Sequence, residues 1–199
     1  ANLLETTGAH RLVTLDLHAP QIQGFFSIPV DMLQGIHILA EYIERKQLED
    51  VVVVAPNNPG VGRARKMANQ LDVPIAFIDK RKSEEDGKEV IHIVGNIEGK
   101  TAVIIDDLID TAETVTVTAN LLMERGSKEV YACCVHPVFS GNAIQKLEES
   151  IIKEIVVTNS IHLPEEKRID KLTILSVAPL LADALKRIYE RQSVSELVD

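Results

Sequence analysis

The sequence predicts an α/β protein built on a mainly parallel sheet, with helices on both faces and a β flap. Short apolar runs such as VVVVAP and TAVIID are continuous rather than alternating, which is typical of strands covered on both faces. These runs alternate with helix-period segments of roughly 10–17 residues, the arrangement of βαβ crossovers. Residues 80–95 lack a helical pattern but contain a polar turn and a β-like return, so we expect a flap or hairpin there.

The order of the elements follows from the same periodicities. We expect strands at residues 11–17, 51–55, 75–79, 101–106, 129–135, 155–159 and 173–177. Helices are expected at residues 29–45, 61–71, 112–124, 142–147 and 178–191. The opening ANLLETTGAH is similar to the last turns of an amphipathic helix that ends near Gly8. We therefore interpret the chain as a fragment, or as a protein from which an N-terminal part was removed.

Composition and charge exclude several classes of protein. Hydrophobic residues make up 45% of the 199 residues, enough for a packed core. The net charge of −9 argues against nucleic-acid binding, which needs a basic face. No apolar run approaches the ~20 residues that span a bilayer, and the start is not that of a signal peptide. Cys133 and Cys134, adjacent in VYACCVHP, are expected to pack in the core rather than bind metal, which suits a cytoplasmic location.

Polar clusters follow several of the predicted strands. They lie at residues 16–18, 56–62, 79–82 and 106–116. In an open parallel sheet, ligands bind beyond the carboxyl ends of the strands and near helix N-termini. The sequence therefore predicts one ligand site to which these clusters contribute.

The cluster at residues 106–116 is the most specific. Asp106 and Asp107 are expected to end a buried strand, where they can accept hydrogen bonds from vicinal ribose hydroxyls or hold Mg²⁺. Residues 110–114 then begin a helix, whose free N–H groups and threonine hydroxyls suit a sugar phosphate. Ordinary N-capping by Asp110 or Thr111 is the alternative, but capping does not require the two preceding aspartates.

These residues carry a family resemblance. VIIDDLIDTAETVT resembles the phosphoribosyl-binding motif of type I phosphoribosyltransferases, in which a hydrophobic strand and two acids precede a D-T-A/G-G-T loop. The rest of the chain, through the final SVSELVD, resembles the ribose-phosphate pyrophosphokinases (PRPP synthetases) of the bacterial type. This second resemblance rests on LVTLDLHAPQIQGFF, IAFIDKR, IVGNIEGKTAVIIDD, VYACCVHPVFSG and IVVTNSI.

The resemblance implies a domain organisation. Residues 1–33 would be the end of an N-terminal domain that supplies most of the ATP site. Residues 34–177 would form the C-terminal phosphoribosyltransferase-like domain, and residues 178–199 a helix that packs back toward the N-terminal domain. Most of the N-terminal domain would be missing.

The resemblance also implies an activity and its residues. Family members transfer diphosphate from ATP to ribose 5-phosphate with Mg²⁺, giving PRPP and AMP, and assemble as dimers that build hexamers. Lys80 and Lys82 would be catalytic, while His18 and a degenerate Asn57 would serve the metal. Ribose 5-phosphate would be bound by Asp106, Asp107, Asp110, Thr111, Ala112, Glu113 and Thr114. We expect a homo-oligomer, or an assembly with an active paralogue.

Four positions depart from the family pattern. Asn57 replaces an aspartate, Pro59 a glycine, Lys82 an arginine and Glu113 the glycine of the phosphate loop. Glu113 brings a negative charge to an anion site, and strain as well if that position requires a positive φ. The acidic SEEDG after Lys82 also suits polyphosphate poorly.

Two hypotheses remain open after these departures. The chain is an active PRPP synthetase, or it is a catalytically impaired paralogue that acts as a regulatory or assembly subunit. A nucleobase phosphoribosyltransferase fits less well, because DLHAPQIQGFF and DKRK resemble the synthetases. A dinucleotide-binding protein is disfavoured because Gly60-Val61-Gly62 is only a fragment of GxGxxG.

Overall fold

The computed structural model of the chain describes residues 1–82 and 89–197. The chain divides into two compact units, one formed by Ala1–Gly35 with Ser176–Asp199 and the other by Ile36–Leu175. Each unit is described by itself. The domain roles expected for residues 1–33, 34–177 and 178–199 stay predictions.

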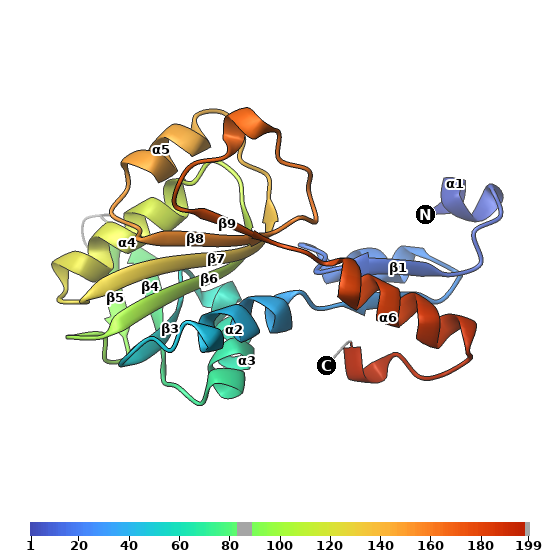
Figure 1. The fold of residues 1–199 in the computed structure, drawn as a ribbon, viewed down its shortest axis with the longest axis horizontal. Coiled ribbons are helices and arrows are strands. Elements are labelled where there is room, and N and C mark those ends of the chain that lie inside the picture. The colour runs from blue at the N-terminus through green and yellow to red at the C-terminus, as the bar shows by residue number, and fades with distance from the viewer. Residues whose placement is uncertain (83–88, 198–199) are drawn as a thin grey trace. The chain divides into compact units, whose positions relative to one another are not determined.

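The larger unit is built on a seven-stranded sheet with the order β5-β4-β3-β6-β7-β8-β9 (Figure 1). Every neighbouring pair is parallel except β4 and β5, which run antiparallel. The strands are β3 (Val51–Ala55), β4 (Ile75–Lys82), β5 (Glu89–Val94), β6 (Thr101–Ile109), β7 (Glu129–Pro137), β8 (Glu154–Thr158) and β9 (Leu172–Leu175). The expected mainly parallel sheet is confirmed.

Helices cover both faces of this sheet. Figure 1 shows α2 (Ile36–Arg45) and α3 (Val61–Leu71) on one face, and α4 (Glu113–Glu124) and α5 (Ala143–Glu149) on the other. Short 3-10 helices occur at η2 (Asn58–Gly60) and η3 (Glu165–Lys167). Both layers of helices bury apolar side chains, so the central strands are covered on both sides. This explains why their sequences are continuous apolar runs.

The chain reverses its direction across the sheet between β3 and β6. From β3 it proceeds through α3 to β4 on one side, whereas from β6 it proceeds through α4 to β7 on the other. Right-handed crossovers in opposite directions place their helices on opposite faces. The carboxyl ends of β3 and β6 therefore lie at the topological switch point, the position at which open α/β sheets bind ligands.

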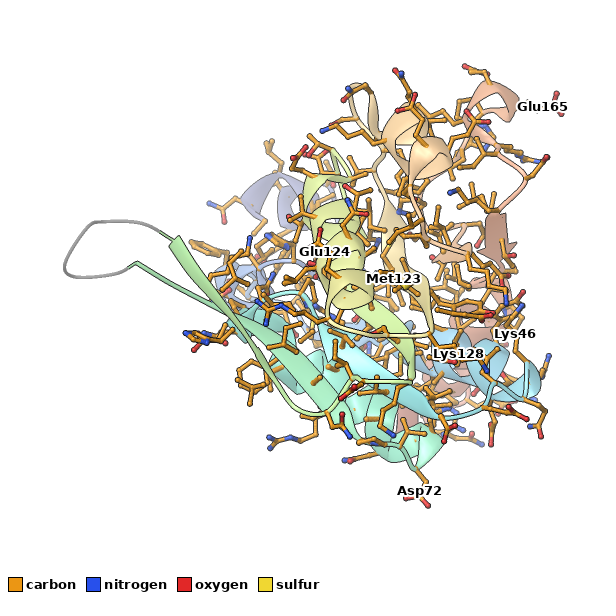
Figure 2. The ribbon with its side chains drawn as sticks, turned by 90° about the vertical axis from the view of Figure 1, so that its left-hand side faces the viewer. Lys46, Asp72, Met123, Glu124, Lys128 and Glu165 are labelled. Atoms are coloured by element: carbon orange, nitrogen blue, oxygen red, sulfur yellow. The ribbon has the colours of Figure 1, made fainter. Side chains whose placement is uncertain are left out.

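The expected flap is a β hairpin. β4 and β5 pair from Phe77 with Val94 to Lys82 with Glu89, and Figure 2 shows the hairpin extending away from the helices. Gly95, with φ +110°, follows β5. A glycine is required there, because a Cβ would lie 2.7 Å from the carbonyl oxygen of Ile75. The acidic stretch SEEDG lies outside the described residues.

The smaller unit contains a two-stranded parallel sheet and short helices. β1 (Leu12–Leu15) pairs with β2 (Val30–Leu33), and Arg11 donates to both carboxylate oxygens of Asp31 at 2.5 and 2.9 Å. The helical elements are α1 (Asn2–Thr6), η1 (Pro20–Phe25), α6 (Ala178–Tyr189) and η4 (Ser195–Leu197).

Several expected element boundaries were wrong. Residues 29–45 are not one helix, because Val30–Leu33 pairs with β1 as a strand and α2 begins only at Ile36. The strand expected at residues 11–17 ends at Leu15, since Asp16 has a φ of +39°. β6 continues three residues beyond Asp106, so the two aspartates lie within the strand rather than at its end. The other elements differ from expectation by up to three residues at an end, as is usual for such boundaries.

The core of the larger unit includes the two cysteines, as expected. Cys133 and Cys134 are buried and free, and burial raises the pKa of both thiols. Neighbouring residues of a strand point to opposite faces, and both faces are covered here. In the part of the chain that the structure describes, no helix has the length and apolarity needed to cross a membrane.

Candidate functional site

Two aspartates and an arginine meet at the reversal between β3 and β6. Asp106 and Asp107 lie near the carboxyl end of β6, and Arg63 lies in the first turn of α3, which follows β3. The guanidinium nitrogen Nη1 of Arg63 lies 3.3 Å from Asp106 Oδ1 and 3.5 Å from Asp107 Oδ1. The backbone N–H of Asp107 also donates to Asp106 Oδ1 at 3.0 Å. A single cation therefore faces both carboxylates.

The acid pair is only partly neutralised. Burial is the largest cause that raises the pKa of Asp106 to about 7, and the hydrogen bond and charge of Asp107 raise it further. The Asp107 N–H and the Arg63 guanidinium act in the opposite direction without cancelling this rise. The raised pKa means that Asp106 loses its charge more readily than an exposed aspartate, and a divalent cation or a hydroxyl-bearing ligand would favour its ionised form.

The loop after β6 presents the N-terminus of α4. Ala112 precedes the helix with φ +62°, and no side chain caps the helix there. The first N–H groups of a helix lack intrahelical acceptors, so they face whatever lies before the helix. Thr111 and Thr114 are exposed, and Asp110 accepts a hydrogen bond from the Ser140 hydroxyl. The arrangement suits an anion.

Glu113 is the first residue of α4. The residue with a positive φ is its neighbour Ala112, so the strain considered for Glu113 falls on Ala112 instead. The Glu113 carboxylate accepts a hydrogen bond from the ammonium of Lys146 on α5, which lowers the pKa of Glu113.

The loop after β3 is occupied by its own hydrogen bonds. The amide oxygen of Asn57 accepts the Gly60 N–H at 2.9 Å, which caps η2. The Asn58 amide donates to Asp79 Oδ1 at 3.0 Å, linking this loop to β4. Asn57 therefore has a local structural role at the position where the resemblance implies a metal ligand.

The remaining expected residues lie in two places. Lys80 is exposed on β4 opposite Ile91, and Lys82 belongs to the same strand. His18 belongs to the smaller unit, where it is exposed between β1 and η1. Within one unit, the structure brings Asp106, Asp107 and the loop of residues 110–114 together.

Mg²⁺ fits this donor set only with help from a ligand. Among residues 1–82 and 89–197, no group of three or more histidine, cysteine, aspartate or glutamate side chains could hold a metal ion. Mg²⁺ commonly binds through one or two carboxylates, with water and substrate oxygens completing its shell. The Asp106–Asp107 pair matches that pattern.

Arg63 was missed by the sequence analysis. It lies 43 positions before Asp106, and nothing local in NNPGVGRAR distinguishes it from Arg65. The available signal was topological, because α3 begins at the carboxyl end of β3 and β3 neighbours β6.

Comparisons with known proteins identify the family of the chain. Residues 84–199 match the family model of the phosphoribosyl synthetase-associated domain. The chain is 63% identical to the ribose-phosphate pyrophosphokinase of Bacillus caldolyticus over 199 residues, covering 100% of this chain and 63% of that protein. It is 62% identical to the Bacillus subtilis (strain 168) ribose-phosphate pyrophosphokinase over 197 residues, covering 99% of this chain and 62% of that protein.

A solved structure extends the comparison to the fold. The crystal structure of phosphoribosylpyrophosphate synthetase from Mycobacterium smegmatis superimposes with a TM-score of 0.88 at 43% identity. The match covers 96% of this chain and 62% of that one. The predicted resemblance and the predicted fold class are confirmed.

Proposed function

Since the chain belongs to the ribose-phosphate pyrophosphokinase family, we propose that the protein transfers diphosphate from ATP to O1 of ribose 5-phosphate, giving PRPP and AMP. The chain spans 63% of the length of its Bacillus caldolyticus relative, so this activity is proposed for the whole protein. One observation supports the proposal most. A partly buried acid pair on β6 is followed, across a short loop, by a helix N-terminus without a side-chain cap, which suits the hydroxyls and the phosphate of one sugar phosphate.

The ribose end of the substrate is assigned to Asp106 and Asp107. Ribose hydroxyls donate to their carboxylate oxygens, and Arg63 limits the repulsion between the two acids. A carboxylate that accepts from a hydroxyl makes a charge-assisted hydrogen bond, the stronger kind. The pair would fix the orientation of the sugar and hence of O1.

The 5-phosphate is assigned to the loop of residues 110–114. Its oxygens would accept from the first N–H groups of α4 and from the exposed hydroxyls of Thr111 and Thr114. Asp110 and Ala112 shape the loop, the first through Ser140 and the second through its left-handed conformation.

The diphosphate end is assigned to cationic and polar side chains. Lys80 and Lys82 would neutralise the charge that develops on the transferred phosphates, and His18 would help to hold ATP. When bound at Asp106 and Asp107, Mg²⁺ supplies further neutralisation of phosphate charge. Asn57 provides no formal charge for a metal.

Ligand binding and turnover test this proposal separately. Calorimetric titration of the chain with ribose 5-phosphate should give tighter binding than ribose or inorganic phosphate alone, because both halves of the site are engaged. AMP formation from Mg²⁺, ATP and ribose 5-phosphate then tests the reaction. A chain that binds ribose 5-phosphate no better than ribose contradicts the assignment of the sugar-phosphate site.

A catalytically impaired paralogue is the second candidate. It is supported by the Asn57 amide oxygen, which accepts the Gly60 N–H where the family has an aspartate. Binding without turnover, with turnover restored by Asn57→Asp together with Glu113→Gly, would favour this candidate. Turnover near that of a family enzyme would contradict it.

Assembly and location complete the proposal. We infer a cytoplasmic homo-oligomer, a dimer or hexamer, or an assembly with an active paralogue. Light scattering of the purified chain tests its oligomeric state.

A further inference from the structure

A negatively charged side chain stands beside the proposed phosphate site. Glu113 is the first residue of α4, where its side chain is 64% exposed. An acidic side chain in the first turn is attracted to the same helix N–H groups that would bind a phosphate. It would also repel an incoming phosphate. An unrestrained Glu113 would therefore compete with the ligand for this site.

Lys146 on α5 restrains that side chain. Its ammonium donates to Glu113 Oε2, and the Lys146 side chain itself is 30% exposed. The α5 helix is packed against the core through Ala143 and Leu147, which are fully buried. The ammonium is thus presented from a packed helix rather than from a free loop.

A second contact joins the same two segments. The backbone N–H of Ser140, which precedes α5, donates to the carbonyl oxygen of Asp110 at 3.0 Å, and its hydroxyl donates to the Asp110 carboxylate. The proposed phosphate loop is therefore attached to the α5 segment at its start, through Asp110, and at the helix, through Glu113. The partner of Glu113 is part of the loop's own framework.

We propose that Lys146 is a positioning residue for the sugar-phosphate site, which holds the Glu113 carboxylate against α5 and away from the first N–H groups of α4. This inference rests on the proposed function, because it assumes that the loop binds the 5-phosphate. Its consequence is that the loop tolerates an acidic residue as long as Lys146 is present.

The inference predicts a background-dependent effect. Lys146→Met should weaken ribose 5-phosphate binding roughly two- to fivefold, the range for one charge near a helix N-terminus. In the Glu113→Gln background the same substitution should change the affinity little, because there is no carboxylate to release. Lys146→Arg should retain the affinity, since it keeps the cation.

The experiment is a double-mutant cycle measured by calorimetry with ribose 5-phosphate. Lys153→Met is the matched control, because Lys153 also forms an exposed ion pair, with Glu129 at 2.7 Å, at the opposite ends of the strands. It should leave the affinity unchanged. An equal loss in both Glu113 backgrounds would mean that Lys146 contacts the phosphate directly, and no loss in either would mean that it has no role. Both results overturn the inference.

A measurement without ligand keeps the two proposals separate. In NMR titrations the pKa of Glu113 should lie below its ordinary value and return toward it in Lys146→Met. If the chain binds no ribose 5-phosphate, the proposed function fails, whereas the titration still decides whether Lys146 holds Glu113. If the pKa of Glu113 does not change in Lys146→Met, the inference is overturned while the proposed function is unaffected.

Discussion

At the amino ends of β7 and β8 each of two glutamates pairs with a different lysine, whereas near the carboxyl end of β6 one arginine faces two aspartates. Glu129 pairs with Lys153 at 2.7 Å, and Glu154 pairs with Lys46 at 2.5 Å. Burial disfavours the ionised form of Glu154, but hydrogen bonds from Lys46, Tyr42 and Thr173 outweigh it and lower the pKa.

The Glu154 cluster ties α2 to the sheet. The Tyr42 hydroxyl donates to Glu154 at 2.5 Å and the Thr173 hydroxyl donates at 2.7 Å. Lys46, labelled in Figure 2 just after α2, also lies over the rings of Tyr42 and Tyr131, at 5.4 and 5.8 Å from their centroids. Here the charges are matched and serve stability.

At the carboxyl ends of the strands, the pKa of the acidic side chain is shifted in the opposite direction. The pKa of Asp106 is raised, so its ionised form is less stable in the folded protein than in the unfolded chain. Such under-neutralised groups are concentrated at functional sites, where a ligand supplies the missing partner. The acidic residues at the amino ends and at the carboxyl ends of the strands therefore serve distinct purposes. Substitutions at each end can test this distinction.

The largest expected effect is the loss of the acid pair. Asp106→Asn combined with Asp107→Asn should weaken ribose 5-phosphate binding at least about 100-fold, because hydrogen bonds to charged groups contribute about 1.5–3 kcal/mol each. Calorimetric titration measures the change. Glu129→Gln, which removes a carboxylate at the amino end of β7, is the control and should bind normally. Equal losses of affinity in both variants would contradict the distinction between the two ends of the strands.

The same acid pair carries a pH prediction. Because the pKa of Asp106 is raised from 3.8 to about 7, its ionisation lowers the free energy of unfolding as the pH rises from about 4 through 7. Asp106→Asn should therefore be stabilised relative to the unsubstituted chain more at pH 8 than at pH 4, in urea titrations. A larger gain at pH 4 would show the opposite sign.

At the amino end of β8, Glu154→Gln should instead reduce stability. It removes the carboxylate from Lys46, at a cost of about 1–3 kcal/mol at pH 7. Because the pKa of Glu154 is lowered from 4.5, its contribution is full above that value and is lost as the pH falls below it. Urea unfolding at pH 7 and pH 3 should show a larger difference between the variant and the unsubstituted chain at pH 7 than at pH 3.

Glu129→Gln again provides the matched control. The Lys153 and Glu129 side chains are 54% and 32% exposed, and an exposed ion pair contributes about 0–1 kcal/mol. A loss of stability in Glu129→Gln as large as that in Glu154→Gln would contradict the role given to the Glu154 cluster.

Much of the fold could be predicted because periodicity is a local signal. The helix at residues 61–71 was predicted to the residue, and the continuous apolar runs indicated covered strands. β2 was missed because its four residues become a strand only through pairing with Leu12–Leu15, which a local pattern cannot reveal.

The candidate site shows the same limit. The motif VIIDDLIDTAETVT predicted the acid pair and the helix start, since both lie in one continuous segment. The partners that determine their charges come from elsewhere, Arg63 from 43 positions away and Lys146 from 33. From the sequence alone, Glu113 adds an unfavourable negative charge to an anion site. In the folded chain, the ammonium of Lys146 is its counter-ion.

The smallest expected effect concerns the arginine shared by the acid pair. Arg63→Met should raise the pKa of Asp106 above about 7, because the guanidinium is one of the groups that favour its ionised form. Ribose 5-phosphate affinity should fall only two- to fivefold, as for a partly exposed ion pair. Carbon-13 NMR titration of the Asp106 carboxyl and calorimetry measure the two effects. Arg65→Met, on the same helix but at an exposed position, is the control. An unchanged Asp106 pKa in Arg63→Met would mean that the guanidinium does not favour the ionised form of Asp106, which contradicts the role given to Arg63.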